Sequence, residues 1–279
     1  MTQDALKRVP AALTIAGSDP SGGAGIQADL KTFTVLGVYG ASVLTALTAQ
    51  STRGVTGILS VPPAFVTLQI ATLADDLAIR AVKTGMLNDR ATVAAVAEAV
   101  RSFKLAPLVV DPVMVATSGD LLLEPGAVDA LRAELIPLAD VLTPNMAEAA
   151  RLLDAPVAAN EAEMEAQAGR LLALGCKAVV LKGGHGDGAE AIDVLLQQGG
   201  APKRLALPRI ATRNTHGTGC TFAAALTAYL VRGETIESAA AQAKRFVHAA
   251  LQSGALLAVG HGSGPVDHLH TMRPPKPNN

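Results

Sequence analysis

Short runs rich in Val, Ile and Leu alternate along the chain with longer Ala- and Leu-rich segments at helical spacing. This alternation constrains the fold more than any other feature. It is typical of βαβ units, in which helices cover both faces of a mostly parallel sheet. We therefore predict an α/β layered fold, and the 279 residues suffice for one large domain of this kind.

The same reading gives the predicted elements. The strands are Ala12–Ala16, Val43–Ala46, Ala81–Lys83, Leu108–Asp111, Val141–Thr143 and Ala178–Lys182. The helices are Ile26–Val35, Pro63–Ala74, Asp89–Phe103, Ala127–Leu135, Met146–Leu153, Glu161–Leu174, Thr218–Val231 and Ile236–Leu256. Asn88, Asn160 and Thr235 are expected helix caps, and Gly37 and Gly175 are expected helix ends.

Two stretches break the alternation. Val38–Val61 is rich in Thr, Val and Ser, and Ala191–Ile210 looks like a hairpin turning at Gly199-Gly200. We expect each to be a β excursion beside the main sheet. The first follows the first βα unit, where a small flap would cover a ligand or mediate a homodimer.

Charge and composition exclude several classes of partner. The chain carries 23 basic and 24 acidic residues without a basic run, so nothing predicts binding to nucleic acid or to an anionic membrane. Two cysteines do not make a disulfide framework, and the first residues lack the layout of a signal peptide. We expect a cytoplasmic protein that binds small ligands. Residues 1–270 are expected to form one domain, with residues 271–279 as a disordered tail.

The first chemical candidate is the glycine-rich turn from Ile15 to Asp29, between a strand and a helix. Such a turn lets the backbone approach a ligand closely. It matches neither a Walker A loop nor a dinucleotide-binding fingerprint. A tight connection without function is the alternative interpretation.

The second candidate, Asn214–Thr221, is another glycine turn that opens an apolar helix. Free N–H groups from Gly217 to Cys220, together with the positive helix end, favour a phosphate. Cys220 in the first turn is expected to have a lowered thiol pKa, which would make it a base or nucleophile. The alternative is that Cys220, like Cys176, is a packing residue.

Three further polar groups follow predicted strands. Asn145 and Glu148 have the spacing of a capping box, but also of a carboxylate that holds a metal near phosphates. Asp111 and Lys182 also stand at strand ends. His185, His216 and His261 lack the spacing of a zinc site, and we assign them no metal.

Taken together, these segments resemble a known family. In chain order they read ALTIAGSDPSGGAGIQADLKTF, TALTAQST, VKTGML, VVDPVM, LTPNMAEA, LKGGH and NTHGTGCTFAAAL. They are similar to the hydroxymethylpyrimidine/phosphomethylpyrimidine kinases of thiamine biosynthesis, in the ribokinase-like superfamily. The resemblance implies a three-layer α/β/α fold, ATP with Mg²⁺, and two successive phosphorylations of 4-amino-5-hydroxymethyl-2-methylpyrimidine.

The resemblance also implies roles for individual residues. The pyrimidine pocket would comprise Gly17, Asp29, Gln50 and Val113, with the Asp29 and Gln50 side chains pairing the polar edge of the ring. ATP would be bound by Lys182, Asn145, Thr218 and Gly219. Glu148 and Asp111 would hold the metal, partly through water. Gly217, Thr218, Gly219 and Cys220 would form the catalytic anion hole.

One departure leaves alternatives open. The wider superfamily has an aspartate as general base where this chain has Cys220, a change shared with some pyridoxal kinases. A pyridoxal kinase is therefore the first alternative, although Gln50 argues against it. The second is a regulator that binds a pyrimidine or a nucleotide without turnover.

Overall fold

The computed structural model describes residues 9–115, 122–124, 126–184 and 188–273. Its strands are β1 (Ala11–Ser18), β2 (Tyr39–Ser51), β3 (Gly54–Ser60), β4 (Ile79–Thr84), β5 (Leu108–Val110), β6 (Val141–Leu142), β7 (Ala178–Lys182), β8 (Glu190–Gln197) and β9 (Lys203–Pro208). Its helices are α1 (Gly25–Val35), α2 (Pro63–Asp76), α3 (Arg90–Ser102), α4 (Ala127–Ala130), α5 (Met146–Leu153), α6 (Glu161–Leu172), α7 (Thr218–Val231) and α8 (Ile236–Gly254).

All these strands belong to one nine-stranded sheet in the order β3-β2-β1-β4-β5-β6-β7-β8-β9. The pairs from β2 through β7 are parallel, whereas β3, β8 and β9 run antiparallel to their neighbours. The predicted α/β fold with a mostly parallel sheet is confirmed. The two expected β excursions are not separate from this sheet, because β3 extends one edge and the β8–β9 hairpin extends the other.

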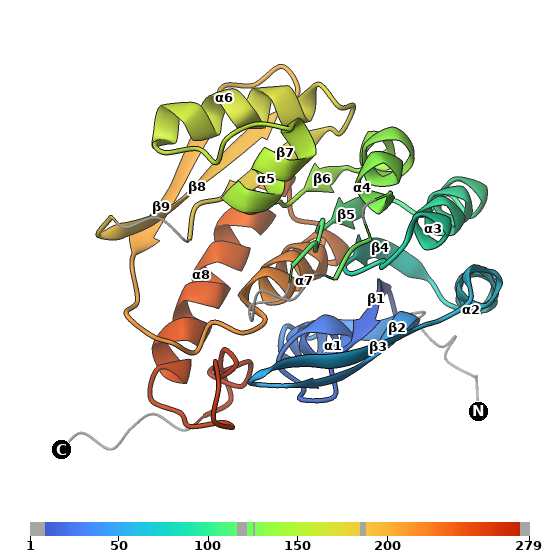
Figure 1. The fold of residues 1–279 in the computed structure, drawn as a ribbon, viewed down its shortest axis with the longest axis horizontal. Helices are drawn as coiled ribbons and strands as arrows, with labels where there is room; N and C mark the ends of the chain where they lie inside the picture. The colour runs from blue at the N-terminus through green and yellow to red at the C-terminus, as the bar shows by residue number, and fades with distance from the viewer. Residues whose placement is uncertain (1–8, 116–121, 125, 185–187, 274–279) are drawn as a thin grey trace, which may run out of the picture.

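Helices cover both faces of the sheet (Figure 1). Successive strand residues point to opposite faces, so alternate side chains enter different cores. In β7, Val179 and Leu181 pack into the core beneath α2 to α6, whereas Ala178 and Val180 pack into the core beneath α7 and α8. Burial on both faces explains why the central strands read as nearly continuous apolar runs.

Most local predictions agree with the structure, and one cap was wrong. Asn160 and Thr235 cap α6 and α8 as expected. Asn88 does not cap α3, because Asp89 does so by accepting a hydrogen bond from the Thr92 N–H at 2.8 Å. The predicted helix Ala127–Leu135 is α4 followed by one π turn, Leu131–Leu135.

The chain ends are described only in part. Arg273, in the expected tail, donates a hydrogen bond to Oδ1 of Asp267 at 3.2 Å. Residues 274–279 lie outside the described residues, as does His185. Among the helices that the structure describes, none has the length and apolar character needed to cross a membrane.

Candidate active site

The carboxyl ends of the parallel strands open into one cavity of about 630 Å³. Parallel strands bring the segments that follow them to the same edge of a sheet, which is where ligands bind in open α/β folds. Of the residues predicted for the site, those lining this cavity are Gly17, Gln50, Asp111, Val113, Asn145, Glu148, Lys182, Gly217, Thr218, Gly219 and Cys220.

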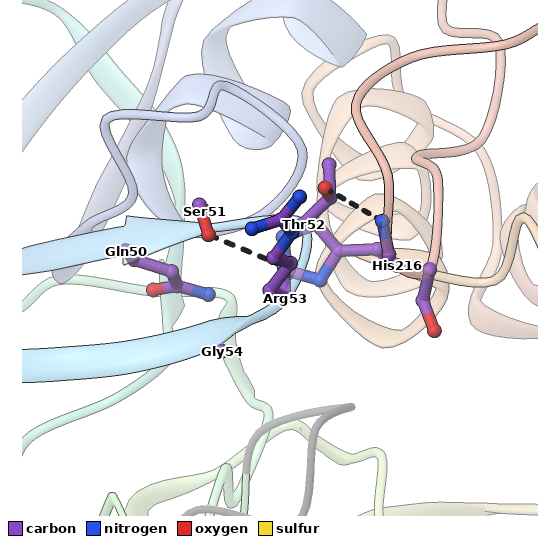
Figure 2. Close-up of a pocket in the computed structure, with 8 residues that line it drawn as sticks. Gln50, Ser51, Thr52, Arg53, Gly54 and His216 are labelled. Atoms are coloured by element: carbon purple, nitrogen blue, oxygen red, sulfur yellow. Dashed lines mark hydrogen bonds between the residues drawn. The ribbon is translucent and has the colours of Figure 1, made fainter.

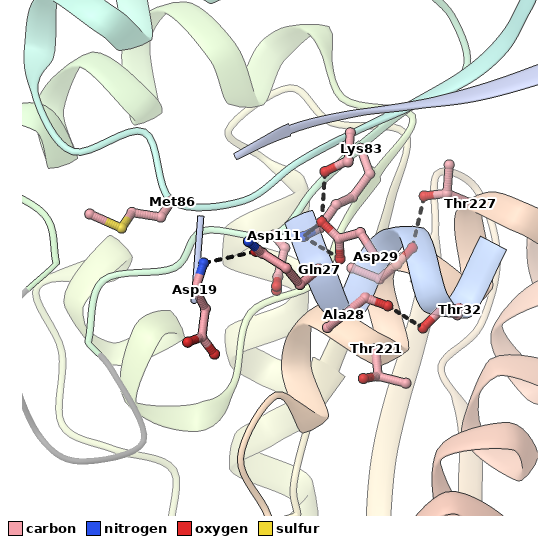
Figure 3. Close-up of polar contacts among 12 residues, drawn as sticks. Asp19, Gln27, Ala28, Asp29, Thr32, Lys83, Met86, Asp111, Thr221 and Thr227 are labelled. Carbon is pink, nitrogen blue, oxygen red and sulfur yellow. Dashed lines mark hydrogen bonds and ion pairs between the residues drawn. The ribbon is translucent and has the colours of Figure 1, made fainter. Parts of the chain in front are cut away.

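Asp29 is the exception and corrects the predicted pyrimidine pocket. Its side chain is fully buried and does not line the cavity. Both carboxylate oxygens accept hydrogen bonds from Nζ of Lys83, at 3.1 and 2.9 Å, and Oδ2 accepts another from Thr14 at 2.6 Å (Figure 3). A carboxylate whose oxygens are occupied in this way is not available to pair with a substrate ring.

Lys83 is a cavity residue that the sequence reasoning missed. It lies near the end of β4 and is also fully buried. Burial alone lowers the pKa of a lysine, but the Asp29 carboxylate, assisted by Cys220 and Asp111, raises the pKa of Lys83 above its usual value. The sequence did contain a signal for this residue: Lys83 lies inside the predicted buried strand, and a buried lysine needs a partner of opposite charge.

The amino end of α7 faces the cavity with its backbone. Gly217 caps the helix with a φ of 79° and makes no side-chain cap, and the Thr218 N–H donates to the Thr215 carbonyl at 3.2 Å. A Cβ built on Gly219 would lie 3.3 Å from Nζ of Lys182 and 3.8 Å from Oδ2 of Asp111. The predicted anion hole and the predicted phosphate-binding lysine are therefore adjacent, so one phosphate chain can contact both.

Lys182 is paired in this structure. Its Nζ lies 2.9 Å from Oδ1 of Asp111, which also accepts a hydrogen bond from the Thr143 hydroxyl at 3.0 Å. Among the described residues none donates a hydrogen bond to Oδ2 of Asp111, although this atom is buried. A buried carboxylate oxygen without a partner is costly unless a ligand completes it.

Asn145 and Glu148, at the start of α5, both line the cavity. They form a capping box, in which Glu148 accepts from the Asn145 N–H at 2.7 Å and Asn145 accepts from the Glu148 N–H at 2.9 Å. Burial, together with the nearby Asp111 carboxylate, raises the pKa of Glu148 to about 7, although the Lys182 ammonium acts in the opposite direction. The cap thus holds a carboxyl group at the cavity, close to Asp111.

Cys220 lies at the predicted place, but its expected acidity was wrong. Burial raises the pKa of its thiol to about 11; Lys83 opposes the shift, whereas Asp29 and Asp111 add to it. The helix end and the lysine do not outweigh burial beside two carboxylates. In the free protein the thiol is therefore protonated at neutral pH.

One end of the cavity is lined by Gly17, Gln50 and Val113, with Met86 and Leu122 as apolar neighbours. Oε1 of Gln50 accepts a hydrogen bond from the Thr48 hydroxyl at 3.1 Å. A second cavity of about 290 Å³ adjoins this end, between the β2–β3 turn, His216 and Gly262-Ser263 (Figure 2). Gln50 and His216 line both cavities.

Asp19 and His216 form a second buried contact that the sequence reasoning missed. Nε2 of His216 lies 2.8 Å from Oδ2 of Asp19, and both residues line the larger cavity. Burial alone would raise the pKa of Asp19, but hydrogen bonds from His216, Ser21 and Ala24 lower it to about 2. The two residues are 197 positions apart, so no local pattern links them.

The opposite end of the cavity is formed by β8, β9 and α8. The Lys244 ammonium lies 2.7 Å from Oδ2 of Asp193, whose Oδ1 accepts the Gly183 N–H at 3.0 Å. Apolar side chains of β9 and α8, Leu207, Val247 and Leu251, line the same end. The cavity therefore joins an apolar end at β9 and α8, a middle with the charged side chains of Lys182, Asp111 and Glu148, and an end where Gln50 lies among apolar side chains.

Comparisons with known proteins agree with this layout. The family model described as phosphomethylpyrimidine kinase matches residues 19–267. The hydroxymethylpyrimidine/phosphomethylpyrimidine kinase of Rhizobium meliloti is 53% identical over 259 residues, which cover 93% of this chain and 97% of that protein. The thiamine biosynthesis bifunctional protein ThiED of Geobacter sulfurreducens is 51% identical over 92% of this chain and 52% of its own length.

A solved structure has the same fold. The pyridoxal kinase of Staphylococcus aureus in complex with AMP-PCP and pyridoxal superposes with a TM-score of 0.87 at 34% identity, covering 96% of each chain. The expected three-layer fold is therefore found in a kinase that holds an ATP analogue.

Proposed function

Because the chain belongs to the phosphomethylpyrimidine kinase family, we propose that it phosphorylates 4-amino-5-hydroxymethyl-2-methylpyrimidine with ATP, and then phosphorylates the monophosphate, in thiamine biosynthesis. The observation that carries the proposal is 53% identity with a kinase of this activity over nearly the whole of both chains. The cavity supports it, because the predicted residues other than Asp29 line one continuous space.

The end of the cavity that Gln50 lines fits the pyrimidine. An aminopyrimidine offers a flat ring with a polar edge, which a side-chain amide recognises well. We assign the edge to Gln50, and the walls to Gly17, Val113 and Met86. Asp29 has no direct role in this scheme.

The middle of the cavity fits the phosphates. The N–H groups of Gly217 and Gly219 would donate to phosphate oxygens, and so would that of Thr218, which here donates to the Thr215 carbonyl. The Lys182 ammonium would neutralise the phosphate charge. Asn145 would contact the nucleotide from the start of α5. Phosphoryl transfer depends mainly on such positioning and charge neutralisation.

Asp111 and Glu148 suit Mg²⁺. This ion is usually held by one or two carboxylates together with substrate phosphates and water. Oδ2 of Asp111, which is buried and has no hydrogen-bond partner among the described residues, and the nearby Glu148 would provide such oxygen ligands. Bound there, Mg²⁺ would supply charge neutralisation for the phosphates.

Cys220 is placed beside the anion hole, where the acceptor hydroxyl would approach. A protonated thiol is not a base, but it can hold that hydroxyl by a hydrogen bond. The loose transition state of phosphoryl transfer needs little removal of the proton before the oxygen attacks. We therefore propose that Cys220 orients the acceptor.

A pyridoxal kinase is the second candidate, favoured by the TM-score of 0.87 with the Staphylococcus aureus enzyme. Gln50 separates the two, because its amide matches an aminopyrimidine edge. ATP consumption measured in parallel with the hydroxymethylpyrimidine, its monophosphate and pyridoxal decides between them. Consumption with pyridoxal alone would overturn the proposal, and binding without any consumption would indicate a regulator.

We also propose a cytoplasmic homodimer. Both cysteines are free thiols, which fits a reducing compartment. The β2–β3 edge carries exposed apolar side chains, and α2 beside it carries two more: Tyr39, Leu47, Ile58, Leu59, Phe65 and Leu68. Apolar side chains gathered at an exposed sheet edge are typical of an interface between chains.

A further inference from the structure

His216 stands where four segments around the cavity meet. It precedes the Gly217–Cys220 anion hole and lines both cavities. Figure 2 places it across the smaller cavity from the β2–β3 turn, which carries Thr52 and Arg53. Only 6% of the residue is exposed. A polar ring buried at such a junction needs fixed partners.

The imidazole is fixed to the glycine-rich loop that follows β1. Oδ2 of Asp19 contacts Nε2 of His216 at 2.8 Å and also accepts the Ala24 N–H at 2.8 Å. Oδ1 of the same carboxylate accepts the Ser21 N–H at 2.8 Å. Asp19 therefore shapes its own loop and ties that loop to His216.

The two loops touch so closely that only glycine fits between them. A Cβ on Gly23 would lie 2.3 Å from Cδ2 of His216. A Cβ on Gly217 would lie 1.8 Å from the carbonyl oxygen of Gly23. The glycine-rich loop thus packs directly on the residue that begins the anion hole.

The backbone of His216 is held independently of its ring. The His216 N–H donates to the Gly264 carbonyl at 3.1 Å, and its own carbonyl accepts the Val266 N–H at 3.3 Å. The same C-terminal loop holds the β2–β3 turn, because the Gly262 N–H donates to the Thr52 hydroxyl at 3.1 Å. The ring is therefore a separate link, added to a backbone that is already in place.

We propose that the contact between Asp19 and His216 has a positioning role: it fixes the position of the pyrimidine end of the cavity relative to the anion hole. Gly17 lies two residues before Asp19, and Gly217 directly follows His216. The contact thereby sets the distance and angle between two reactants: the acceptor oxygen of the substrate bound near Gly17, and the phosphate bound at Gly217. This inference rests on the proposed function, because it assumes an acceptor bound near Gly17.

If the two loops are no longer held in this relative position, we expect a specific kinetic consequence. The nucleotide would still bind through Lys182 and the α7 backbone, but the acceptor would no longer be aligned. Misplacement of a reactant by about 1 Å costs roughly a hundredfold in rate. The phosphate would then pass to water more often, relative to the pyrimidine, than in the parent protein.

The test compares His216→Leu, which removes the polar contact, with His216→Gln, whose amide can reach Asp19. The measurements are kcat and KM for each substrate, and the ratio of ATP hydrolysed to pyrimidine phosphorylated. For His216→Leu we expect kcat to fall about tenfold to a hundredfold, an unchanged KM for ATP and a raised ratio. For His216→Gln we expect most of the parent's kcat and ratio.

His268→Leu is the matched control. His268 is another buried histidine; its Nε2 lies 2.9 Å from the hydroxyl of Thr221 on α7, and it does not line the cavity. If both Leu variants lose thermal stability and kcat in parallel with an unchanged ratio, the role of His216 is only structural and the inference fails. A parent protein that does not phosphorylate the pyrimidine would instead overturn the proposed function.

Discussion

Gln50 is the residue to which we assign the choice of substrate. Replacing Gln50 with Met leaves the polar edge of the aminopyrimidine unpaired, which costs about 1–3 kcal/mol for a buried hydrogen-bonding group. We expect KM for the hydroxymethylpyrimidine to rise by about tenfold or more, with little change in KM for ATP. Steady-state kinetics with each substrate varied in turn measures both.

Lys182→Ala is the reciprocal control for Gln50→Met. It removes the ammonium next to Gly219, so the loss should appear in kcat and leave pyrimidine binding nearly intact. Equal pyrimidine kinetics in Gln50→Met and the parent would remove Gln50 from the pocket.

The pKa of the Cys220 thiol predicts how its reactivity depends on pH. Burial raises its pKa to about 11, so the thiolate fraction at neutral pH is small and grows only in alkaline solution. We expect iodoacetamide labelling of the free protein to be slow at pH 7 and to keep rising above about pH 9, where the labelling rate of an ordinary thiol has already levelled off. The rate is followed by mass spectrometry across pH.

Cys220→Ser identifies the labelled site. It leaves Cys176 as the sole thiol, which is buried and whose pKa burial also raises to about 11. Fast labelling of Cys220 at pH 7 would mean that the residue is a thiolate that can act as a base, and would contradict the role of a protonated thiol.

At the scale of elements, α7 is held at its amino end by a close approach of two loops. Gly217→Ala forces a residue with a side chain into a φ of 79° and places its Cβ 1.8 Å from the Gly23 carbonyl oxygen. Positive φ alone costs about 1–3 kcal/mol. We expect a larger loss of unfolding free energy, together with a loss of kcat, measured by urea denaturation and by kinetics.

Gly233, beyond the other end of α7, is the matched control. Its φ is 87°, but a Cβ there meets no atom within 4 Å. Gly233→Ala should therefore lose stability from backbone strain alone and keep its kcat. Equal effects of the two substitutions on kcat would mean that the close approach at Gly217 does not shape the anion hole.

At the scale of the whole molecule, the exposed β2–β3 edge predicts the oligomeric state. Leu59 on β3 is 66% exposed, and a charge there would be buried in a dimer but harmless in a monomer. We expect Leu59→Glu to shift the protein from dimer to monomer, as measured by analytical ultracentrifugation over a range of concentrations.

Val157→Glu is the control for this substitution. Val157 is 51% exposed and lies between α5 and α6, helices that pack on β7 and β8 and not on the β2–β3 edge. It should leave the sedimentation unchanged. A parent protein that sediments as a monomer at all concentrations would contradict the dimer.

The sequence by itself determined the layered α/β fold, several element bounds and most of the cavity lining. The bounds of α5 and α7, Met146–Leu153 and Thr218–Val231, match the prediction because caps, glycines and apolar periodicity are local signals. The polar segments after successive strands meet at one edge because parallel strands must end there.

Only the tertiary structure decided which polar groups are free to act. Asp29 looked like a ligand, but Lys83, 54 residues away, occupies its carboxylate. Cys220 has the helix position of an acidic thiol, yet burial beside Asp29 and Asp111 makes it a weak acid. The contact of Asp19 with His216 joins residues that are 197 positions apart. Partners and burial arise from long-range packing, and the free energy of a charged group depends on its surroundings more than on its neighbours in sequence.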